Sequence, residues 1–417
     1  MMPMQAERPP ILKIVSQHAE GAAFEWLLRD AAVESAHHNL VQLSRIDERV
    51  SAHLDGLLVD KDAGWDACME GLAWKEPGEI FAAAWMALST TPAERIERVL
   101  ELALTRADLL RAFVSALGWM EWCYVAGRAR DWMESDDSRL RELGLSAAAV
   151  HRRLSRSELG RALEDEDQGV RRRAMKAVGE MGESCFLPQL RHAMLSKDEA
   201  ERFQAAWSGC LLGDSSFTSE LCLQARAPTA EAEQACLLAV RSMNHEDSFR
   251  WLAAFAKNGG DTRVLVKGMG ASGDASHLPV LLEMMEDAVW SRLAGESFTF
   301  ITGLDLAEEG MEGQAPEGYN AGPNDDPEDE NVAGDPDEGL PWPLATEVAR
   351  WWHGSPPSPA GRRFLGKAPL TDHLRTVLRT GTQRQRAAAA LELALREPGK
   401  ILYNTAAPGV RQGTAFT

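Results

Sequence analysis

The stretch QGVRRRAMKAVGEMGESCFLPQL, residues 168–190, has the pattern of two short helices joined by a glycine turn. One apolar face at helical spacing runs through its first half and consists of Val170, Ala174, Ala177 and Val178. Gly182 follows where helices commonly end in the left-handed conformation. A second apolar stripe then consists of Leu187, Leu190 and Met194. This stretch therefore predicts a helix–turn–helix unit.

The unit returns at intervals of 29–31 residues. The second copy places apolar or turn residues at matching positions, namely Ala205, Gly213, Phe217 and Leu221. The third has first-helix positions Ala232, Cys236, Ala239 and Val240, then Asn244 in the glycine place, followed by Phe249 and Leu252. The fourth ends with Gly273, Leu278, Pro279 and Leu281, although Asp261 stands where the first copy has Val170. One helix pair cannot bury its own apolar face, so neighbouring copies must stack.

The spacing and the turns resemble the short HEAT repeats of phycobilin-lyase-like arrays. The predicted fold is all-α: an α-solenoid of short HEAT-like helix-pair repeats, with helical caps at both ends and one long acidic loop insertion. The expected segments are a helical N-terminal cap region at 1–80, the repeat array at 81–300, an acidic Gly/Pro-rich insertion at 301–343 and a helical C-terminal cap at 344–417.

Three glycines in the fourth copy also spell a dinucleotide-binding fingerprint. Gly268, Gly270 and Gly273 form G-x-G-x-x-G after an apolar run. No pattern of a βαβ unit surrounds them, and the glycines fall where the repeat needs its turn. We interpret them as part of the fold, with no cofactor.

Two helices are expected in the N-terminal region. Residues 22–36 place large apolar side chains on one stripe, which we expect to be buried: Phe24, Leu27, Leu28 and Ala31/Ala32. Residues 43–58 do the same with Ile46, Val50, Leu54 and Leu57/Leu58. The polar side chains His37, His38, Asp47, His53 and Asp55 do not share a face well, so we interpret them as solvated residues rather than metal ligands.

The insertion between 303 and 340 contains thirteen Asp and Glu residues and no Lys or Arg. Its candidate partner-binding residues are Asp325, Asp326, Glu328, Asp329, Glu330, Asp335, Asp337 and Glu338. Eleven Lys and Arg against three acids follow from 350 to 417, so the loop is expected either to lie against this basic cap or to bind a basic partner. Calcium is a weaker alternative, because the acids lack EF-hand spacing.

Charge and composition narrow the classes further. A formal net charge of −19 disfavours nucleic-acid binding, which needs clustered cations. Six Cys without a CxxC pair indicate reduced thiols, and neither a signal peptide nor a membrane span is apparent, so a cytoplasmic location is expected. The sequence contains no H-E-x-x-H, G-x-S-x-G or Walker motif, which predicts no catalytic site.

The flanks resemble an uncharacterised bacterial family with HEAT-like repeats, some of whose members are encoded among type VI secretion genes. The resemblance is carried by FEWLLRDAAV (24–33), RIDERVSAHLDGL (45–57), ITGLDL (301–306), APEGYNAGPNDDPEDENV (315–332), LPWP (340–343) and RTGTQRQRAAAALELAL (379–395). It implies a link to effector loading or spike assembly, and no catalytic residue. We expect a non-enzymatic protein-binding scaffold or adaptor. The alternatives are an immunity-type inhibitor that covers a basic toxin surface, and an enzyme, either bilin-lyase-like or a DNA glycosylase.

Overall fold

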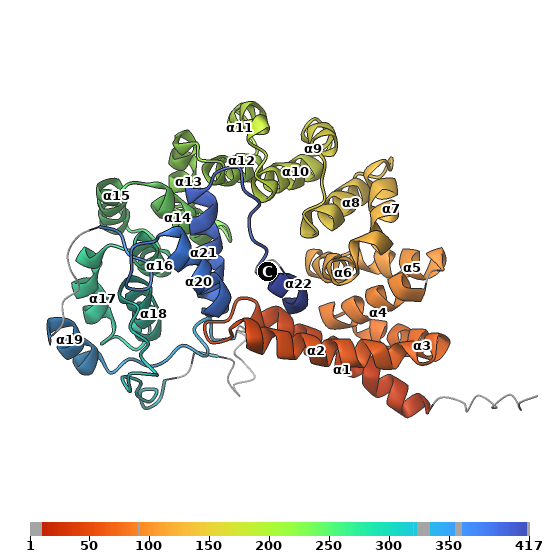
Figure 1. Ribbon diagram of the computed structural model, residues 1–417, viewed down its shortest axis with the longest axis horizontal. Coiled ribbons are helices and arrows are strands. Elements are labelled where there is room, and N and C mark those ends of the chain that lie inside the picture. The colour runs from red at the N-terminus through yellow and green to blue at the C-terminus, as the bar shows by residue number, and fades with distance from the viewer. Residues whose placement is uncertain (1–10, 91, 320, 323–333, 355–360, 415–417) are drawn as a thin grey trace, which may run out of the picture. The chain divides into compact units, whose positions relative to one another are not determined.

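The computed structural model (Figure 1) describes residues 11–90, 92–319, 321–322, 334–354 and 361–414. These residues form α-helices and four short 3-10 helices, and contain no β-strand beyond two isolated bridges. Consecutive helices pack against their neighbours along the chain. The predicted all-α, solenoid-like fold is confirmed.

The chain divides into two compact units. Unit 1 contains Met1–Ala174 and Asn404–Thr417, and unit 2 contains Met175–Tyr403. The division falls inside helix α10 (Gln168–Met181), within the first repeat. The segment boundaries expected at 80, 300 and 343 stay predictions.

Unit 1 begins with long helices and continues with shorter pairs. Its elements are α1 (Leu12–Ala32), α2 (Leu40–Leu58), α3 (Lys61–Gly71), η1 (Leu72–Trp74), α4 (Pro77–Thr90), α5 (Ala93–Ala103), α6 (Ala107–Trp119), α7 (Trp122–Met133), α8 (Ser138–Val150), α9 (Arg156–Leu163) and α22 (Gly409–Thr414). Helix α4 contacts α1, α2, α3, α5 and α6. It is therefore the central helix of this unit's N-terminal half.

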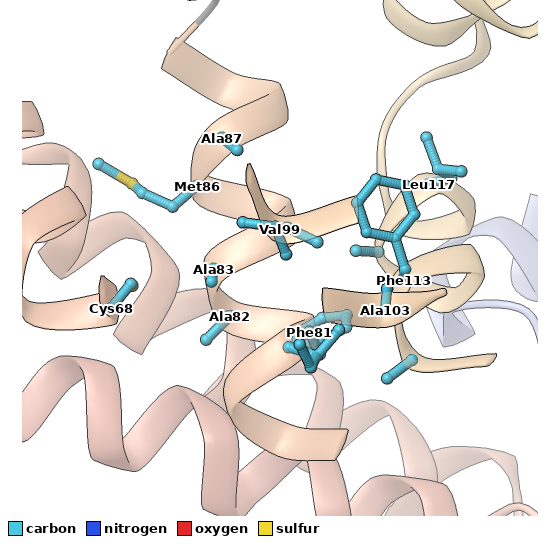
Figure 2. Close-up of a cluster of buried hydrophobic side chains, with 14 of the residues drawn as sticks. Cys68, Phe81, Ala82, Ala83, Met86, Ala87, Val99, Ala103, Phe113 and Leu117 are labelled. Carbon is cyan, nitrogen blue, oxygen red and sulfur yellow. The ribbon is translucent and has the colours of Figure 1, made fainter. Parts of the chain in front are cut away.

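Small side chains let the neighbours of α4 approach it closely. Ala82, Ala83, Ala84 and Ala87 are buried on different sides of the helix. Figure 2 shows Cys68 of α3 facing α4 from one side, with Val99 of α5 and Phe113 of α6 on the other. Large rings fill the remaining space: Trp26 stacks on Phe81 at a centroid distance of 5.1 Å. Helix α4 is apolar on most of its circumference because neighbouring helices bury it on several sides.

Unit 2 contains the clearest repeats. Its elements after α10 are η2 (Ser184–Phe186), α11 (Leu187–Ala193), α12 (Glu199–Leu211), η3 (Ser215–Phe217), α13 (Thr218–Gln224), α14 (Ala232–Ser242), α15 (His245–Lys257), α16 (Thr262–Ser272), η4 (Ala275–His277), α17 (Leu278–Met284), α18 (Ser291–Thr302), α19 (Ala345–Gly354), α20 (Thr371–Thr380) and α21 (Gln383–Arg396). The predicted first-helix residues Val170, Ala174, Ala177 and Val178 are all buried.

The predicted turn recurs in three copies. Gly182, Gly213 and Gly273 each have a positive φ and precede a 3-10 turn and a second helix. Later segments of the chain lie against these turns: a Cβ on Gly182 would meet the Lys400 carbonyl oxygen at 2.6 Å, and one on Gly273 would meet that of Arg363 at 2.0 Å. These positions therefore require glycine twice over, for conformation and for space.

The third copy departs from the prediction. Asn244 is not left-handed; it has φ −70° and ψ 167°, and its side chain accepts a hydrogen bond from the Asp247 backbone as the N-cap of α15. Phe249 is exposed rather than buried, and its ring stacks on His277. The physical reason is that Asn can cap a new helix directly, which makes the glycine turn unnecessary.

The dinucleotide fingerprint is structural, as interpreted. Gly268 and Gly270 lie inside α16, and Gly273 ends that helix. A Cβ on Gly270 would lie 2.9 Å from the Cα of Ser297 on α18, whose hydroxyl donates to the Val266 carbonyl. The same contact occurs between Gly179 and Ser208, whose hydroxyl donates to the Met175 carbonyl. The glycines thus allow close helix packing.

Candidate partner-binding surface

Helix α1 has two apolar faces, and only one of them is buried. The buried face consists of Val15, Ala19, Ala22, Ala23, Trp26, Arg29 and Ala32. Most of the stripe that the sequence predicted as buried is exposed instead: Phe24 is 60% exposed, Leu28 41% and Leu27 39%, and Ala31 is exposed too, whereas Ala32 is buried. The prediction was wrong for the three large side chains because small alanines, rather than bulky side chains, face the neighbouring helices and let their backbones approach.

A cavity of about 210 Å³ adjoins this exposed stripe, between α1, α3 and α4. Its lining residues are Ser16, Ala19, Glu20, Ala67, Cys68, Glu70, Gly71, Trp74, Glu79 and Ala82. Glu20 lies one helical turn before Phe24, and a Cβ on Gly78, next to Glu79, would lie 3.1 Å from the Leu27 Cγ. The exposed stripe and the cavity are therefore parts of one surface, which we call the α1 surface.

Glu79 is the unusual group in this cavity. Its Oε2 atom is buried and has no hydrogen-bond partner among the described residues. Burial raises the pKa of the Glu79 carboxyl, and the charge of Glu76 adds to this, while the hydrogen bond to its own backbone opposes it. A buried polar atom without a partner costs about 1–3 kcal/mol and calls for an explanation.

Trp74 and Cys68 are two further residues that line the cavity. Trp74 ends the short helix η1 and is 76% exposed, an unusual environment for the largest apolar side chain. Burial raises the pKa of the Cys68 thiol to about 12, so this sulfur stays neutral and is not a nucleophile at ordinary pH. The Cys68 thiol therefore gives the cavity no nucleophile at ordinary pH.

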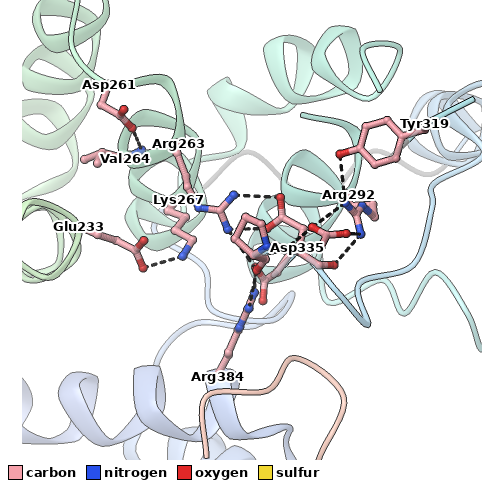
Figure 3. Close-up of polar contacts among 12 residues, drawn as sticks. Glu233, Asp261, Arg263, Val264, Lys267, Arg292, Tyr319, Asp335 and Arg384 are labelled. Carbon is pink, nitrogen blue, oxygen red and sulfur yellow. Dashed lines mark hydrogen bonds and ion pairs between the residues drawn. The ribbon is translucent and has the colours of Figure 1, made fainter. Parts of the chain in front are cut away.

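The acidic insertion is placed only in part. Asp325, Asp326, Glu328, Asp329 and Glu330 lie outside the described residues. Asp335 and Asp337 are described and pair with arginines of the array, whereas Glu338 is exposed. Figure 3 shows the Arg292 side chain joined by dashed lines to Asp335 and Tyr319.

Arg292 is the centre of this anchor. It is 5% exposed, donates to the Asp337 carbonyl at 3.0 Å and lies over the Trp342 ring at 4.5 Å from the centroid. Although burial opposes it, hydrogen bonding to Arg292 holds the pKa of the Asp335 carboxyl below its usual value. Asp335 and Asp337 therefore act as internal partners of unit 2.

Within the described part of the loop, the expected contact with the basic C-terminal region is made by Arg384. Arg384 of α21 donates to the Pro336 carbonyl and pairs with Glu296 of α18 at 2.9 Å. The ionic partners of Asp335 and Asp337, the paired acids of its described part, are Arg292 of α18 and Arg263 of α16, which belong to the array. The number of arginines in a segment does not predict which of them pair with the loop, because that depends on which arginines the tertiary structure places near it.

The histidines and aspartates considered as ligands are dispersed. Asp47 is buried, not solvated as expected, and accepts from Arg29 Nε at 3.0 Å and from the Gly409 backbone at 2.6 Å. His53 lies against His18, with 3.2 Å between their Nδ1 atoms. Among the described residues, no group of three or more His, Cys, Asp or Glu side chains is arranged to hold a metal ion.

No protein-family model matches this chain, and no curated protein matches it either. In the described part of the chain, none of the helices combines the length and the apolar character that a membrane crossing needs.

Sequence reasoning did not find the α1 surface. Its residues come from α1, α3, η1 and α4, and the cavity lining ranges from Ser16 to Ala82. One signal was present: α1 carries a second apolar stripe, Ala19, Ala22 and Trp26, beside the bulkier one. Two stripes on one helix indicate that one of them is available for a partner.

Proposed function

We propose that this protein is a non-enzymatic adaptor that holds a partner protein on the α1 surface. The observation that carries the proposal is the exposed stripe Phe24, Leu27 and Leu28, on a helix whose other apolar face already fills the core. Contiguous exposed apolar side chains mark interaction sites, and aromatic anchors supply much of the energy of association.

The surroundings of the stripe define the chemistry of the partner. Glu20, Glu70 and Glu79 line the adjoining cavity, and the chain carries a formal net charge of −19. Complementary charge favours association and excludes partners of the same sign. The partner should therefore present an apolar face with a basic side chain at its edge.

The family resemblance in the flanks supplies a biological context. It suggests a secretion spike or an effector as the partner, and effector loading or spike assembly as the role. An immunity-type inhibitor would instead use the acidic loop. Because Asp335 and Asp337 are already paired within unit 2, the observations favour the α1 surface.

Affinity purification of the full-length protein from its host, with secretion genes expressed, tests the proposal. We expect a stable protein partner that is lost with the double substitution Phe24→Ser and Leu28→Ser. The control is Tyr124→Ser, because Tyr124 is 73% exposed elsewhere in unit 1. Capturing no partner, or capturing the same one with the double variant, contradicts the proposal. Thermal unfolding should be equal in all three proteins.

A second variant separates the immunity-type alternative. Asp325, Asp326, Glu328, Asp329 and Glu330 are changed together to the corresponding amides. Retention of the partner supports the α1 surface as the site. Loss of the partner from this variant, with retention by the Phe24 and Leu28 variant, assigns binding to the loop instead.

A further inference from the structure

We infer that a second cavity, formed in unit 2 by α14, α21 and residues 362–369, binds the carboxylate group of a small organic acid. Its volume is about 380 Å³, and four charged and three apolar residues line it. The inference goes beyond the proposed function, because this cavity belongs to unit 2 and shares no lining residue with the α1 cavity of unit 1.

Arg241, in the last turn of α14, is a buried cation that uses few of its donors. The residue is 6% exposed and lines the cavity. Its Nη1 atom donates to the Leu237 carbonyl at 2.9 Å, which is the one hydrogen bond that this guanidinium makes to a described residue. A guanidinium has five N–H donors, and leaving donors of a buried charged group unused costs free energy.

The unused donors of Arg241 differ in where they lie. Nε is enclosed, and it lies 3.2 Å from Oε1 of Glu392 in an ion pair that lacks the geometry of a hydrogen bond. Nη2 also has no hydrogen-bond partner among the described residues, but it is not enclosed as Nε is. Because Arg241 lines the cavity, Nη2 is the donor that a ligand there would meet.

The charges of the lining leave a positive excess. Arg241, Arg362 and Arg396 line the cavity together with one carboxylate, that of Glu392. Glu392 pairs with both Arg241 and Arg362, so two cations share one negative charge. Arg362 also donates to the carbonyls of Arg241 and Ala271, whereas Arg396 is exposed and has no ionic partner among the described residues. A bound anion would supply the missing negative charge.

The protonation of Arg241 agrees with this charge count. Burial lowers the pKa of Arg241 to about 10, the charge of Glu392 opposes this, and the charge of Arg362 adds to the lowering. The free cavity therefore disfavours the cation more than water does, although Arg241 stays protonated at neutral pH. A bound anion would raise this pKa again.

The walls favour a carboxylate with a short apolar stem over other anions. Ala368, Pro369 and Leu395 supply the apolar part of the lining. A planar carboxylate matches the fork of an arginine, and it carries a single negative charge. Inorganic phosphate, which is largely dianionic at neutral pH, would be repelled more strongly by Glu392 and would leave the apolar wall unused.

Saturation-transfer nuclear magnetic resonance of n-butyrate with the full chain tests the inference. The method detects magnetisation that passes from the protein to the methyl protons of a bound small molecule. We expect a saturable signal with n-butyrate and none with n-butanol or n-butylammonium, which share the stem but lack the negative charge. Inorganic phosphate should displace n-butyrate less well than n-valerate does.

Two variants and a control locate the binding. Arg396→Gln removes an exposed charge of the lining and should weaken binding about threefold, whereas Arg241→Lys keeps the charge but removes the fork and should weaken it about tenfold. The control Arg379→Gln removes an exposed arginine of α20 outside the lining and should bind n-butyrate like the wild type. Thermal unfolding checks that each variant is folded.

Four results would overturn the inference. They are the absence of a saturable signal with n-butyrate, an equal signal with n-butanol, stronger displacement by phosphate than by n-valerate, and unchanged affinity in Arg396→Gln or in a folded Arg241→Lys. Because Arg396 is exposed, its substitution decides the question even where Arg241→Lys does not fold.

Discussion

Two acidic regions of this protein differ in what neutralises their carboxylates. In unit 2, Asp335 and Asp337 pair with Arg292 and Arg263. In unit 1, the acids that line the α1 cavity have no ionic partner among the described residues, and one of their oxygens is buried without a hydrogen bond.

The difference shows that a sequence segment rich in Asp and Glu does not by itself identify a surface whose carboxylates are free to bind a cationic partner. A carboxylate that already has a hydrogen-bonded arginine gains little from a second cation. The region richest in acid is thus partly closed on itself, whereas the three glutamates that line the α1 cavity have no ionic partner among the described residues.

The largest expected change in stability comes from removing the arginine that pairs with Asp335 in unit 2. Arg292→Met leaves Asp335 without its partner and removes the cation from Trp342, so we expect unit 2 to lose about 3 kcal/mol or more in its free energy of unfolding. Denaturant unfolding measures it. The control Arg250→Met removes an exposed pair with Asp247 and should change stability by less than about 1 kcal/mol. Equal effects would show that the loop anchor adds no stability.

A smaller loss of stability is expected at the turn of Gly273, against which the Arg363 segment lies. Gly273→Ala introduces strain from a positive φ and a collision with the Arg363 carbonyl, while Gly259→Ala has the same strain and open space around the Cβ. The control should lose about 1–2 kcal/mol, the cost of the left-handed conformation, and Gly273→Ala clearly more. Similar midpoints for the two variants in chemical unfolding would mean that the Arg363 segment moves aside freely.

The stability of unit 1 is expected to depend on pH because of the half-buried histidine His151. Burial lowers the pKa of His151 to about 4, although a hydrogen bond to the Leu117 carbonyl opposes this. The unfolded chain then takes up a proton near pH 6.5 that the folded chain refuses, so stability is full above that pH and falls towards pH 4. We expect His151→Gln to flatten this fall, measured by unfolding at pH 7 and pH 5. His37→Gln, at an exposed position, should leave it unchanged.

The smallest expected change in stability concerns Glu79, whose carboxylate has no ionic partner among the described residues of unit 1. Because burial raises the pKa of Glu79 in the folded state, its ionisation destabilises unit 1 at pH 7, and this cost disappears at a pH low enough to protonate the carboxyl in both states. We expect Glu79→Gln to unfold at a slightly higher denaturant concentration at pH 7 and at the wild-type concentration near pH 3. A loss of stability at pH 7 would mean that the carboxylate is needed structurally. The control is Glu97→Gln, which removes an exposed carboxylate of α5 in the same unit.

Much of the repeat was predictable because it depends on local chemistry. The spacing of Val170, Ala174 and Val178 predicts a buried helical face. Glycine at 182 and 273 predicts a left-handed helix end. Both follow from rules that act within a few residues, and both are confirmed. Asn244 shows their limit, since the same residue type serves a left-handed turn or an N-cap, and only the packing of α15 chose the cap.

What the sequence by itself determined is therefore the class of fold, the period of its repeats and the glycines of its turns. Only the tertiary structure decided which stripe of α1 is core, which arginines meet Asp335 and Asp337, and that glutamates of three helices share one cavity. The physical reason is that periodicity specifies which residues share a face of a helix, whereas burial and charge pairing depend on which other helices cover that face.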